Sequence, residues 1–389
     1  MRNPVLLPLA SPGAMELLSL LLDAKSRSRG SLADSAGIAR STAGLRVDEL
    51  VAAGLVSEGA PSYTGGRPST KVQLVPRARI VMAADIGATH ALVAIVDLMG
   101  TVIGESTLLV GSEDEPAQVL EWMLAEVAQL CESHDVDINL VSAAGLGLAA
   151  PIERRTGRPV DPPIMPRWRD FDVRTWLAPH VGVPVLVEKD VNIMALGEYV
   201  VSRPRHPDMI VAKISTGIGA GIIAGGRLQR GAQGLAGDVG HVRVNDRRDV
   251  PCRCGNSGCL EAVASGPAIA AELTRMGTPA NTSQDVVDLV NNGDLNAIQL
   301  VRQAGRDVGE VLAMCVSLLN PSAIVLGGTL ATAGEHLLAG VREAVYARSM
   351  PLATQTLSIT YTSRGSSAAI RGAAAIALDH LLSNGTVDD

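Results

Sequence analysis

The sequence predicts an α/β protein made of a small, basic, mostly helical N-terminal module and a larger, acidic α/β body. Near the N-terminus apolar residues follow helical spacing, and further along the chain apolar runs end in glycine-rich turns. Up to Arg79 there are 10 Lys and Arg against 6 Asp and Glu, a net charge of +4, which leaves 23 against 34, a net of -11, for the remainder. The two parts therefore differ in both charge and periodicity.

The composition is that of an ordinary globular chain. Of the 389 residues, 47% are apolar and 19% are charged, which allows two or three domains with buried cores. No apolar run reaches the roughly 20 residues that cross a bilayer. Pro4, Pro8 and Pro12 interrupt the apolar stretch that a secretory signal would need. We therefore expect a cytoplasmic protein.

Two helices are expected at the start of the chain. Apolar residues recur at helical spacing from Met15 to Leu22, and the pattern ends in the polar, glycine-containing segment 26–30. A short helix over 31–36 then meets a turn at Gly37. A third helix directly after this turn would complete a helix-turn-helix.

The third helix is expected to begin with Ser41 as its N-cap. Its apolar residues, which follow i, i+4, i+7, i+8 spacing and should face inward, are Ala43, Val47, Leu50 and Val51. This packing turns Leu45 and several polar residues outward, where a recognition helix reads the major groove. The polar residues that we expect to contact DNA from this helix are Arg40, Ser41, Thr42 and Arg46, with Arg46 the first candidate for a base contact.

A wing is expected after Gly54, where residues 55–75 read as two short strands around a Gly/Pro-rich loop. Within the loop, the segment Gly-Gly-Arg67-Pro resembles hooks that enter the minor groove, and Lys71 follows it. A basic winged helix-turn-helix on an acidic body is typical of a regulator that binds double-stranded DNA. The alternatives are a three-helix module that binds protein and a surface that is merely solvated.

Three strands of the body end in glycine-rich turns. The run that ends at Asp85 continues as Ile-Gly-Ala-Thr89, and similar turns occur within 209–221 and 323–328. Backbone amides in such turns are free to face an anion, so they are suited to phosphate. Any one of them could be a purely structural turn, but three in order favour a phosphate-binding arrangement.

The five cysteines are too few for a disulfide scaffold in a chain of this length, and three of them fall within 252–259. Cys252, Cys254 and Cys259, with the upstream His241, offer one nitrogen and three sulfur ligands. Four protein ligands close a tetrahedral zinc site and leave no position for water. The sequence therefore predicts a structural Zn²⁺, with free buried thiols as the alternative.

The segments GHVRV, CRCGNSGCLEAVASG, DIGAT and VEKDVNIMALGE resemble the ROK family of repressors, open reading frames and sugar kinases. This resemblance covers essentially the whole chain, including the N-terminal winged helix that the family's regulators carry. It implies a two-lobed, actin-like ATPase fold with sugar and nucleotide in the cleft. The expected division is a DNA-binding domain over 1–78, a small lobe over 79–195 completed by a C-terminal helix at 365–389, and a large lobe with the zinc loop over 196–364.

The resemblance also implies a sugar site. Asp190 matches the catalytic base of family kinases, whereas Lys189 replaces the preceding Asn and Ile164 replaces an Asn of the substrate loop. One ring nitrogen of His241 could bind zinc while the other faces the sugar. Alternatively, Asp190 caps a helix, Glu261 pairs with an arginine and Lys189 is a surface charge. The expected effector-binding residues are Lys189, Asp190, Asp238, His241 and Glu261.

The nucleotide site is implied only in part, because His90 replaces the Lys that often follows the Thr of the first turn. ATP and Mg²⁺ are thus an alternative to a pocket without turnover. The residues expected to contact nucleotide or phosphate are Asp85, Gly87, Thr89, Thr216, Gly217, Gly219, Gly327 and Gly328.

Together these features predict a homo-oligomeric repressor, a dimer or tetramer, on an inverted-repeat operator, with a sugar or sugar phosphate as effector. One rival is an active sugar kinase that carries a DNA-binding head. The other is a regulator whose pocket is dead and which is controlled by a partner protein.

Overall fold

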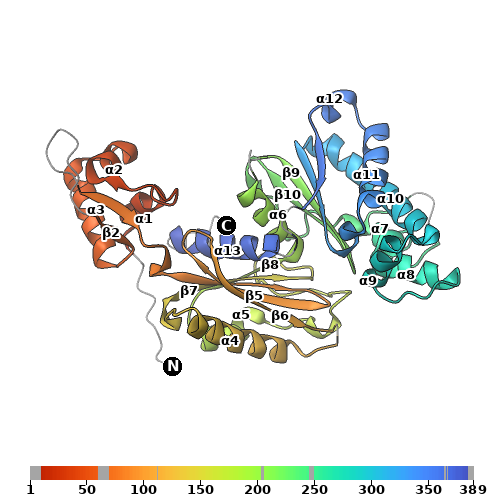
Figure 1. Cartoon of the computed structure of the whole chain (residues 1–389), viewed down its shortest axis with the longest axis horizontal. Coiled ribbons are helices and arrows are strands. Elements are labelled where there is room, and N and C mark those ends of the chain that lie inside the picture. Colours follow the sequence, from red (N-terminus) through yellow and green to blue (C-terminus); the bar gives the residue numbers. More distant parts are fainter. Residues whose placement is uncertain are drawn as a thin grey trace.

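A computed structural model describes residues 10–59, 70–111, 113–202, 206–244, 249–362, 365 and 367–383. These residues form a small N-terminal head and a body built on two five-stranded sheets (Figure 1). Within them, none of the helices combines the length and apolar character needed to span a membrane.

The head is a winged helix-turn-helix, as the sequence predicted. Strands β2 and β3 pair antiparallel as the wing, and β1 pairs with the other edge of β3. Gly37 ends the second helix in the left-handed conformation, with φ at 66°, which gives the turn its direction. The elements of the head are α1 (Pro12–Ser19), β1 (Arg27–Ser28), α2 (Arg29–Ala36), α3 (Arg40–Ala52), β2 (Val56–Glu58) and β3 (Lys71–Leu74).

Some details of the head differ from the sequence prediction. Helix α3 begins at Arg40 with Ala39 as N-cap, so Ser41 lies inside the first turn and is not the cap. Val51, expected to face inward, is 39% exposed, because Val47 and Leu50 already fill the space beneath α3. The polar segment 26–30, where the first helical pattern was expected to end, contains β1 and the start of α2, which begins at Arg29 and not at Ser31. The loop of the wing, with Arg67, lies outside the described residues.

The first sheet of the body has the order β6-β5-β4-β7-β8, with β4, β7 and β8 parallel. Helices α4 and α5 lie on one face, and α13, from the C-terminal part of the chain, lies on the other (Figure 1). The elements are β4 (Ile80–Ile86), β5 (His90–Asp97), β6 (Val102–Leu109), α4 (Pro116–Ser133), β7 (Val141–Leu148), α5 (Val173–Val181), β8 (Val185–Lys189), α6 (Asp190–Val201) and α13 (Ser367–Leu382).

The second sheet has the order β11-β10-β9-β12-β13 and packs against a group of helices that form the largest buried apolar cluster of the described residues. Its elements are β9 (Met209–Ile214), β10 (Ile218–Ala224), β11 (Arg227–Leu228), α7 (Leu260–Ala264), α8 (Gly266–Arg275), α9 (Ser283–Asn291), α10 (Leu295–Leu319), β12 (Ala323–Gly327), α11 (Glu335–Arg348), α12 (Pro351–Thr354) and β13 (Ser358–Tyr361).

Helices α6 and α13 cross closely because both carry glycine at the contact. A side chain at Gly197 would collide with the carbonyl of Ala368, and one at Gly372 would collide with the carbonyl of Ile193. Helix α6 starts directly after β8, so this crossing fixes the position of its first residue, Asp190. The buried apolar residues beneath α13 also form one continuous cluster with the core of the head. A packed path therefore connects α6 with the N-terminal head.

Candidate functional site

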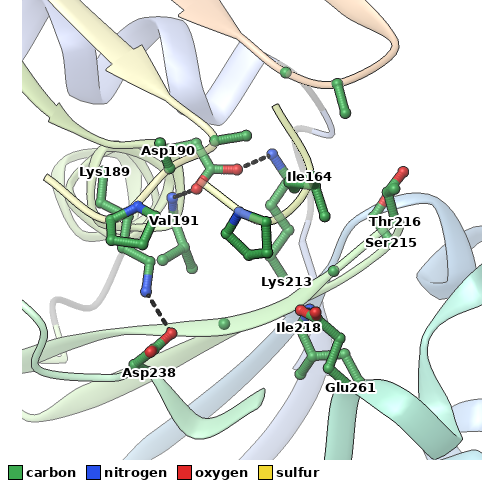
Figure 2. A pocket seen from close by; sticks show the side chains of 18 of the residues that line it. Ile164, Lys189, Asp190, Val191, Lys213, Ser215, Thr216, Ile218, Asp238 and Glu261 are labelled. Carbon is green, nitrogen blue, oxygen red and sulfur yellow. Dashed lines mark hydrogen bonds and ion pairs between the residues drawn. The ribbon is translucent and has the colours of Figure 1, made fainter. Parts of the chain in front are cut away.

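A pocket of about 730 Å³, partly open to solvent, lies between the two sheets of the body, where strand ends and glycine-rich turns meet (Figure 2). It brings together twelve residues singled out from the sequence: Gly87, Thr89, His90, Ile164, Lys189, Asp190, Thr216, Gly217, Gly219, Asp238, His241 and Glu261. It is also lined by Lys213 and Ser215, which sequence reasoning did not single out.

Asp190 is held at the first position of α6 with both carboxylate oxygens engaged. One oxygen accepts a hydrogen bond from the Val191 amide at 2.8 Å, and the other lies 2.7 Å from the ammonium of Lys213 on β9. The N-cap of α6 is Lys189, so Asp190 is not itself the cap. Its negative charge is nevertheless favourable at a helix N-terminus. Asp190 therefore faces the pocket from α6 and is paired across it (Figure 2).

Lys189 is buried, with its side chain 9% exposed, and its ammonium lies 3.2 Å from a carboxylate oxygen of Asp238. The alternative of a solvated surface lysine is therefore wrong. A buried ammonium needs such a partner, since an unpaired charge in the interior is costly. The other oxygen of Asp238 lies 4.0 Å from Nε2 of His241.

Glu261, on α7, accepts a hydrogen bond from the backbone amide of Ile218 at 3.0 Å. Within the described part of the chain no arginine pairs with it, which removes the alternative of a structural ion pair with arginine. Gly217 allows this approach, because a Cβ there would lie 2.7 Å from the carboxylate. The second oxygen of Glu261 has no recorded partner in the described structure, and the side chain lines the pocket.

A buried carboxylate shapes the start of α6. Glu188 accepts hydrogen bonds from the Lys189 amide and the Asn192 side chain, both at 2.9 Å. It also forms an ion pair with Arg230 at 2.6 Å. Sequence reasoning did not identify this role, although a Glu at the end of an otherwise apolar strand was a usable signal.

The end of the pocket beside the glycine-rich turns is its phosphate half. A largely buried group of three charged residues, Asp85, Lys213 and Asp190, lies at this end, and the last two of them line the pocket. Asp85, the next-to-last residue of β4, is almost fully buried, and its carboxylate lies 3.6 Å from Nε2 of His90. Burial raises the pKa of Asp85, but the charge of Lys213 and the hydrogen bond with His90 outweigh it, so the pKa is lowered. Burial likewise opposes the charge of Lys213, yet Asp190 and Asp85 outweigh it and raise its pKa above the ordinary value. Asp85 and Lys213 are therefore both held in their ionised forms.

Two of the three glycine-rich turns are joined directly. The hydroxyl groups of Ser215, after β9, and Thr329, after β12, are 2.9 Å apart. The third turn, after β4, closes with a hydrogen bond from the Gly87 amide to the His90 carbonyl at 2.8 Å. Gly327 and Gly328 lie beside these turns but do not line the pocket as described. Gly327 is in register with Lys213 on the neighbouring strand.

His241, Cys252, Cys254 and Cys259 form one compact cluster, with their ligand atoms within 4.8 Å of one another. Nδ1 of His241 lies 3.7 Å from the sulfur of Cys252, and the sulfurs of Cys254 and Cys259 are 3.7 Å apart. One nitrogen and three sulfurs at this spacing fit a tetrahedral structural Zn²⁺. Because Nε2 of His241 points toward Asp238, the cluster is directly adjacent to the pocket.

The exposed face of α3 carries Arg40, Ser41 and Leu45, the last 73% exposed, with Thr42 half-buried beside them. Arg46 differs from the expectation that it projects freely outward. Its guanidinium lies over Gly13 and 3.4 Å from the carboxylate of Glu16 on α1. Lys71 is exposed at the start of β3, on the wing.

The fold and site define a two-part protein in which a winged helix-turn-helix is joined to a body with the sugar-kinase-like α/β fold. The chain belongs to the ROK family, whose sequence pattern matches residues 81–380. It is 27% identical over 372 residues to a xylose repressor of Bacillus spizizenii, with 94% of each chain covered. It is 28% identical over 309 residues to a glucokinase of Halalkalibacterium halodurans, covering 76% of this chain and 93% of the kinase.

Solved structures give the same division. The fold resembles a ROK family transcriptional regulator described as a homolog of the E. coli MLC protein, with a TM-score of 0.79, 24% identity and 96% of both chains covered. It also resembles a ROK glucokinase from Streptomyces griseus solved with glucose and AMPPNP, with a TM-score of 0.67 and 28% identity over 77% of this chain and 99% of the other. The regulators match the head as well as the body, whereas the kinases match the body. The predicted fold class is confirmed.

Proposed function

We propose that this protein is a transcriptional repressor of carbohydrate-related genes whose operator affinity is set by a sugar in the pocket. The observation that carries this proposal is the union, in one chain, of a winged helix-turn-helix and a carboxylate-lined kinase-like pocket, matched end to end by xylose repressors. The proposal includes the domain limits predicted from the sequence, namely 1–78 for the DNA-binding domain, 79–195 with 365–389 for the small lobe, and 196–364 for the large lobe. Its place of action is the cytoplasm, where operator DNA lies.

The sugar half of the pocket supplies hydrogen-bond acceptors and one charged donor. Glu261, on α7, and Asp238 offer carboxylate oxygens from the side of the second sheet, and Lys189, the N-cap of α6, offers its ammonium. Asp190, the first residue of α6, lies where the sugar half meets the phosphate half. Carboxylates suit sugar hydroxyls because charge-assisted hydrogen bonds are among the stronger ones available in a partly buried site. We assign to the Zn²⁺ the role of holding His241 so that its Nε2 faces the same ligand.

The head is proposed to contact the operator through α3 and the wing. The contact residues remain those predicted from the sequence: Arg40, Ser41, Thr42, Arg46, Arg67 and Lys71. Two heads in a homo-oligomer would address an inverted repeat. The α6–α13 crossing and the core shared with the head give a physical connection, since a ligand that shifts Asp190 also acts on the helices packed against the head.

Fluorescence anisotropy on the DNA flanking the gene tests the proposal. We expect saturable binding that resists non-specific competitor at fixed salt, because phosphate contacts alone make affinity steeply salt-dependent. A sugar effector should change operator affinity about 5- to 150-fold, the usual range of allosteric coupling. Binding that competitor removes completely on every candidate operator contradicts the proposal.

A second candidate is an ATP-dependent sugar kinase with a DNA-binding head. The position of Asp190 in the pocket and the similarity to glucokinases favour it. Such an enzyme releases ADP only when its sugar is present, and Asp190→Ala abolishes that release because the base is lost. Absence of sugar-dependent ADP release across pentoses and hexoses decides against it.

A further inference from the structure

The phosphate half of the pocket is lined by a lysine, Lys213. Lys213 interrupts the otherwise apolar strand β9, which is the central strand of the second sheet. Its side chain is 18% exposed and contacts the carboxylate of Asp190, itself 12% exposed, at 2.7 Å (Figure 2). The charge of Asp85 acts on the same ammonium. A lysine that contacts one carboxylate and is acted on by the charge of a second therefore lines the pocket.

These two carboxylates are the acidic groups that a magnesium nucleotide would need. Mg²⁺ in phosphoryl-transfer sites is bound by one or two carboxylates together with phosphate oxygens. Asp85 and Asp190 stand at the end of β4 and the start of α6, next to the turns at Gly87 and Thr216. In this structure the ammonium of Lys213 already contacts Asp190 and offsets part of the charge of the two carboxylates, in the place where a metal ion would have to bind. The residues present therefore do not fit a Mg²⁺-nucleotide.

The alternative is that Lys213 binds phosphate itself, as lysines do in many nucleotide sites. That role needs an ammonium whose charge is available to the phosphate. Here the ammonium is in contact with Asp190 and is influenced by Asp85, so the three groups together carry a net negative charge. A polyanionic phosphate brought to this group would meet that negative charge. The geometry thus favours a lysine that replaces a metal ion.

We propose that Lys213 is a built-in cation that takes the place of Mg²⁺ between Asp85 and Asp190, so that the pocket binds its sugar without a metal nucleotide. Lys213 is then the residue that separates sugar sensing from phosphoryl transfer. This inference rests on the proposed function only in taking the pocket as a sugar site. The test contains no DNA, so its failure leaves operator binding and its response to sugar untouched.

The test is calorimetric titration of AMPPNP into the full-length protein with and without Mg²⁺. For the wild type, Mg²⁺ should give no gain in nucleotide affinity. In Lys213→Met the two carboxylates lose their cation, and Mg²⁺ should strengthen AMPPNP binding by about tenfold or more, the scale of one strong ionic contact. Asp85→Asn added to this variant should remove the gain.

Lys189→Met is the matched control, because Lys189 is the other lysine of the pocket but pairs with Asp238 in the sugar half. It should create no Mg²⁺ dependence. Lys213→Gln, which keeps a hydrogen-bond donor for Asp190 without the charge, serves if Lys213→Met does not fold. Circular dichroism and the zinc content show whether each variant is native.

Three results would overturn the proposal. One is Mg²⁺-strengthened AMPPNP binding to the wild type. Another is a folded Lys213→Met and Lys213→Gln pair that gains nothing from Mg²⁺. The third is a loss of AMPPNP affinity in both variants, with and without Mg²⁺, since this would identify Lys213 as a phosphate ligand.

Discussion

The two halves of the pocket each contain a lysine paired with a carboxylate, but they differ in what remains available to a ligand. In the sugar half, Asp238 is 31% exposed beside Lys189, and Glu261 uses one oxygen on a backbone amide. In the phosphate half, Asp190 and Asp85 are 12% and 3% exposed and share the charge of Lys213. A kinase-like pocket can therefore keep carboxylates that are available to a sugar, while a single lysine, Lys213 on β9, pairs with the carboxylate that would otherwise be available to a metal ion.

The largest expected effect comes from replacing Cys254, a proposed zinc ligand in the cluster whose His241 lines the pocket. Cys254→Ser should release the metal, lower the melting temperature by about 10 °C and weaken sugar binding, because structural zinc sites supply folding free energy. Zinc content, thermal unfolding and calorimetry measure the three consequences. Cys315→Ser, at a half-buried cysteine outside the cluster, should change stability by less than about 1 kcal/mol. An unchanged melting curve for Cys254→Ser contradicts the assignment.

The next largest effect concerns DNA recognition by the head, which does not involve either half of the pocket. Arg46→Ala should cost about 1–3 kcal/mol on the operator and far less on random DNA, because a base contact carries sequence information. Its ion pair with Glu16 is partly exposed, so folding stability should hardly change. Lys71→Ala is the comparison, since a phosphate contact should weaken binding on both DNAs alike. Equal losses on both DNAs for Arg46→Ala refute the base contact.

A matched pair of carboxylate variants then sharpens the difference between the halves. Glu261→Gln keeps an acceptor for the Ile218 amide but loses the charge, and should weaken sugar binding about tenfold. Asp85→Asn should leave sugar affinity within about twofold, because Asp85 does not line the pocket. Calorimetry with the effector sugar measures both. A larger loss of sugar affinity for Asp85→Asn than for Glu261→Gln would contradict the proposed division of the pocket into a sugar half and a phosphate half.

The smallest expected effect is in the pH dependence of stability. The folded-state pKa of Asp85 is lowered, so its contribution is present above about pH 4, the ordinary Asp value, and is lost as pH falls through the folded value. The pKa of Lys213 is raised, so its contribution is complete below about pH 10 and is lost only as pH rises through the higher value. Urea unfolding from pH 5 to pH 3 should show a shallower loss for Asp85→Asn than for the wild type. Parallel curves contradict this assignment.

Local patterns predicted the features that depend on residues near one another in the chain. The helical period located α1 and α3, and the Cys and His spacing located the metal cluster, since both reflect short-range geometry. Arg46 was predicted to project outward because a helical wheel takes no account of Glu16, thirty residues earlier on α1. The cap of α3 was misplaced by two residues, since Ser41 is a good cap that the chain does not use.

The pocket was only partly predictable, because its central pairs join distant parts of the chain. Lys189 meets Asp238, 49 residues away, and Lys213 meets Asp190, 23 residues away, across the two sheets. A lysine inside an apolar strand such as MIVAKI is a signal that a buried partner exists, but the strand alone does not name the partner. The strand topology supplies that information, since it places the ends of β4, β8 and β9 around one space.

The most direct test measures operator affinity in a buffer that contains neither nucleotide nor Mg²⁺. The measurement is made with and without a sugar whose binding to the protein has been detected by calorimetry. We predict that such a sugar changes operator affinity about 5- to 150-fold under these conditions. A sugar that binds the pocket with clear heat but leaves operator affinity unchanged, or that acts only when ATP and Mg²⁺ are added, would contradict the account.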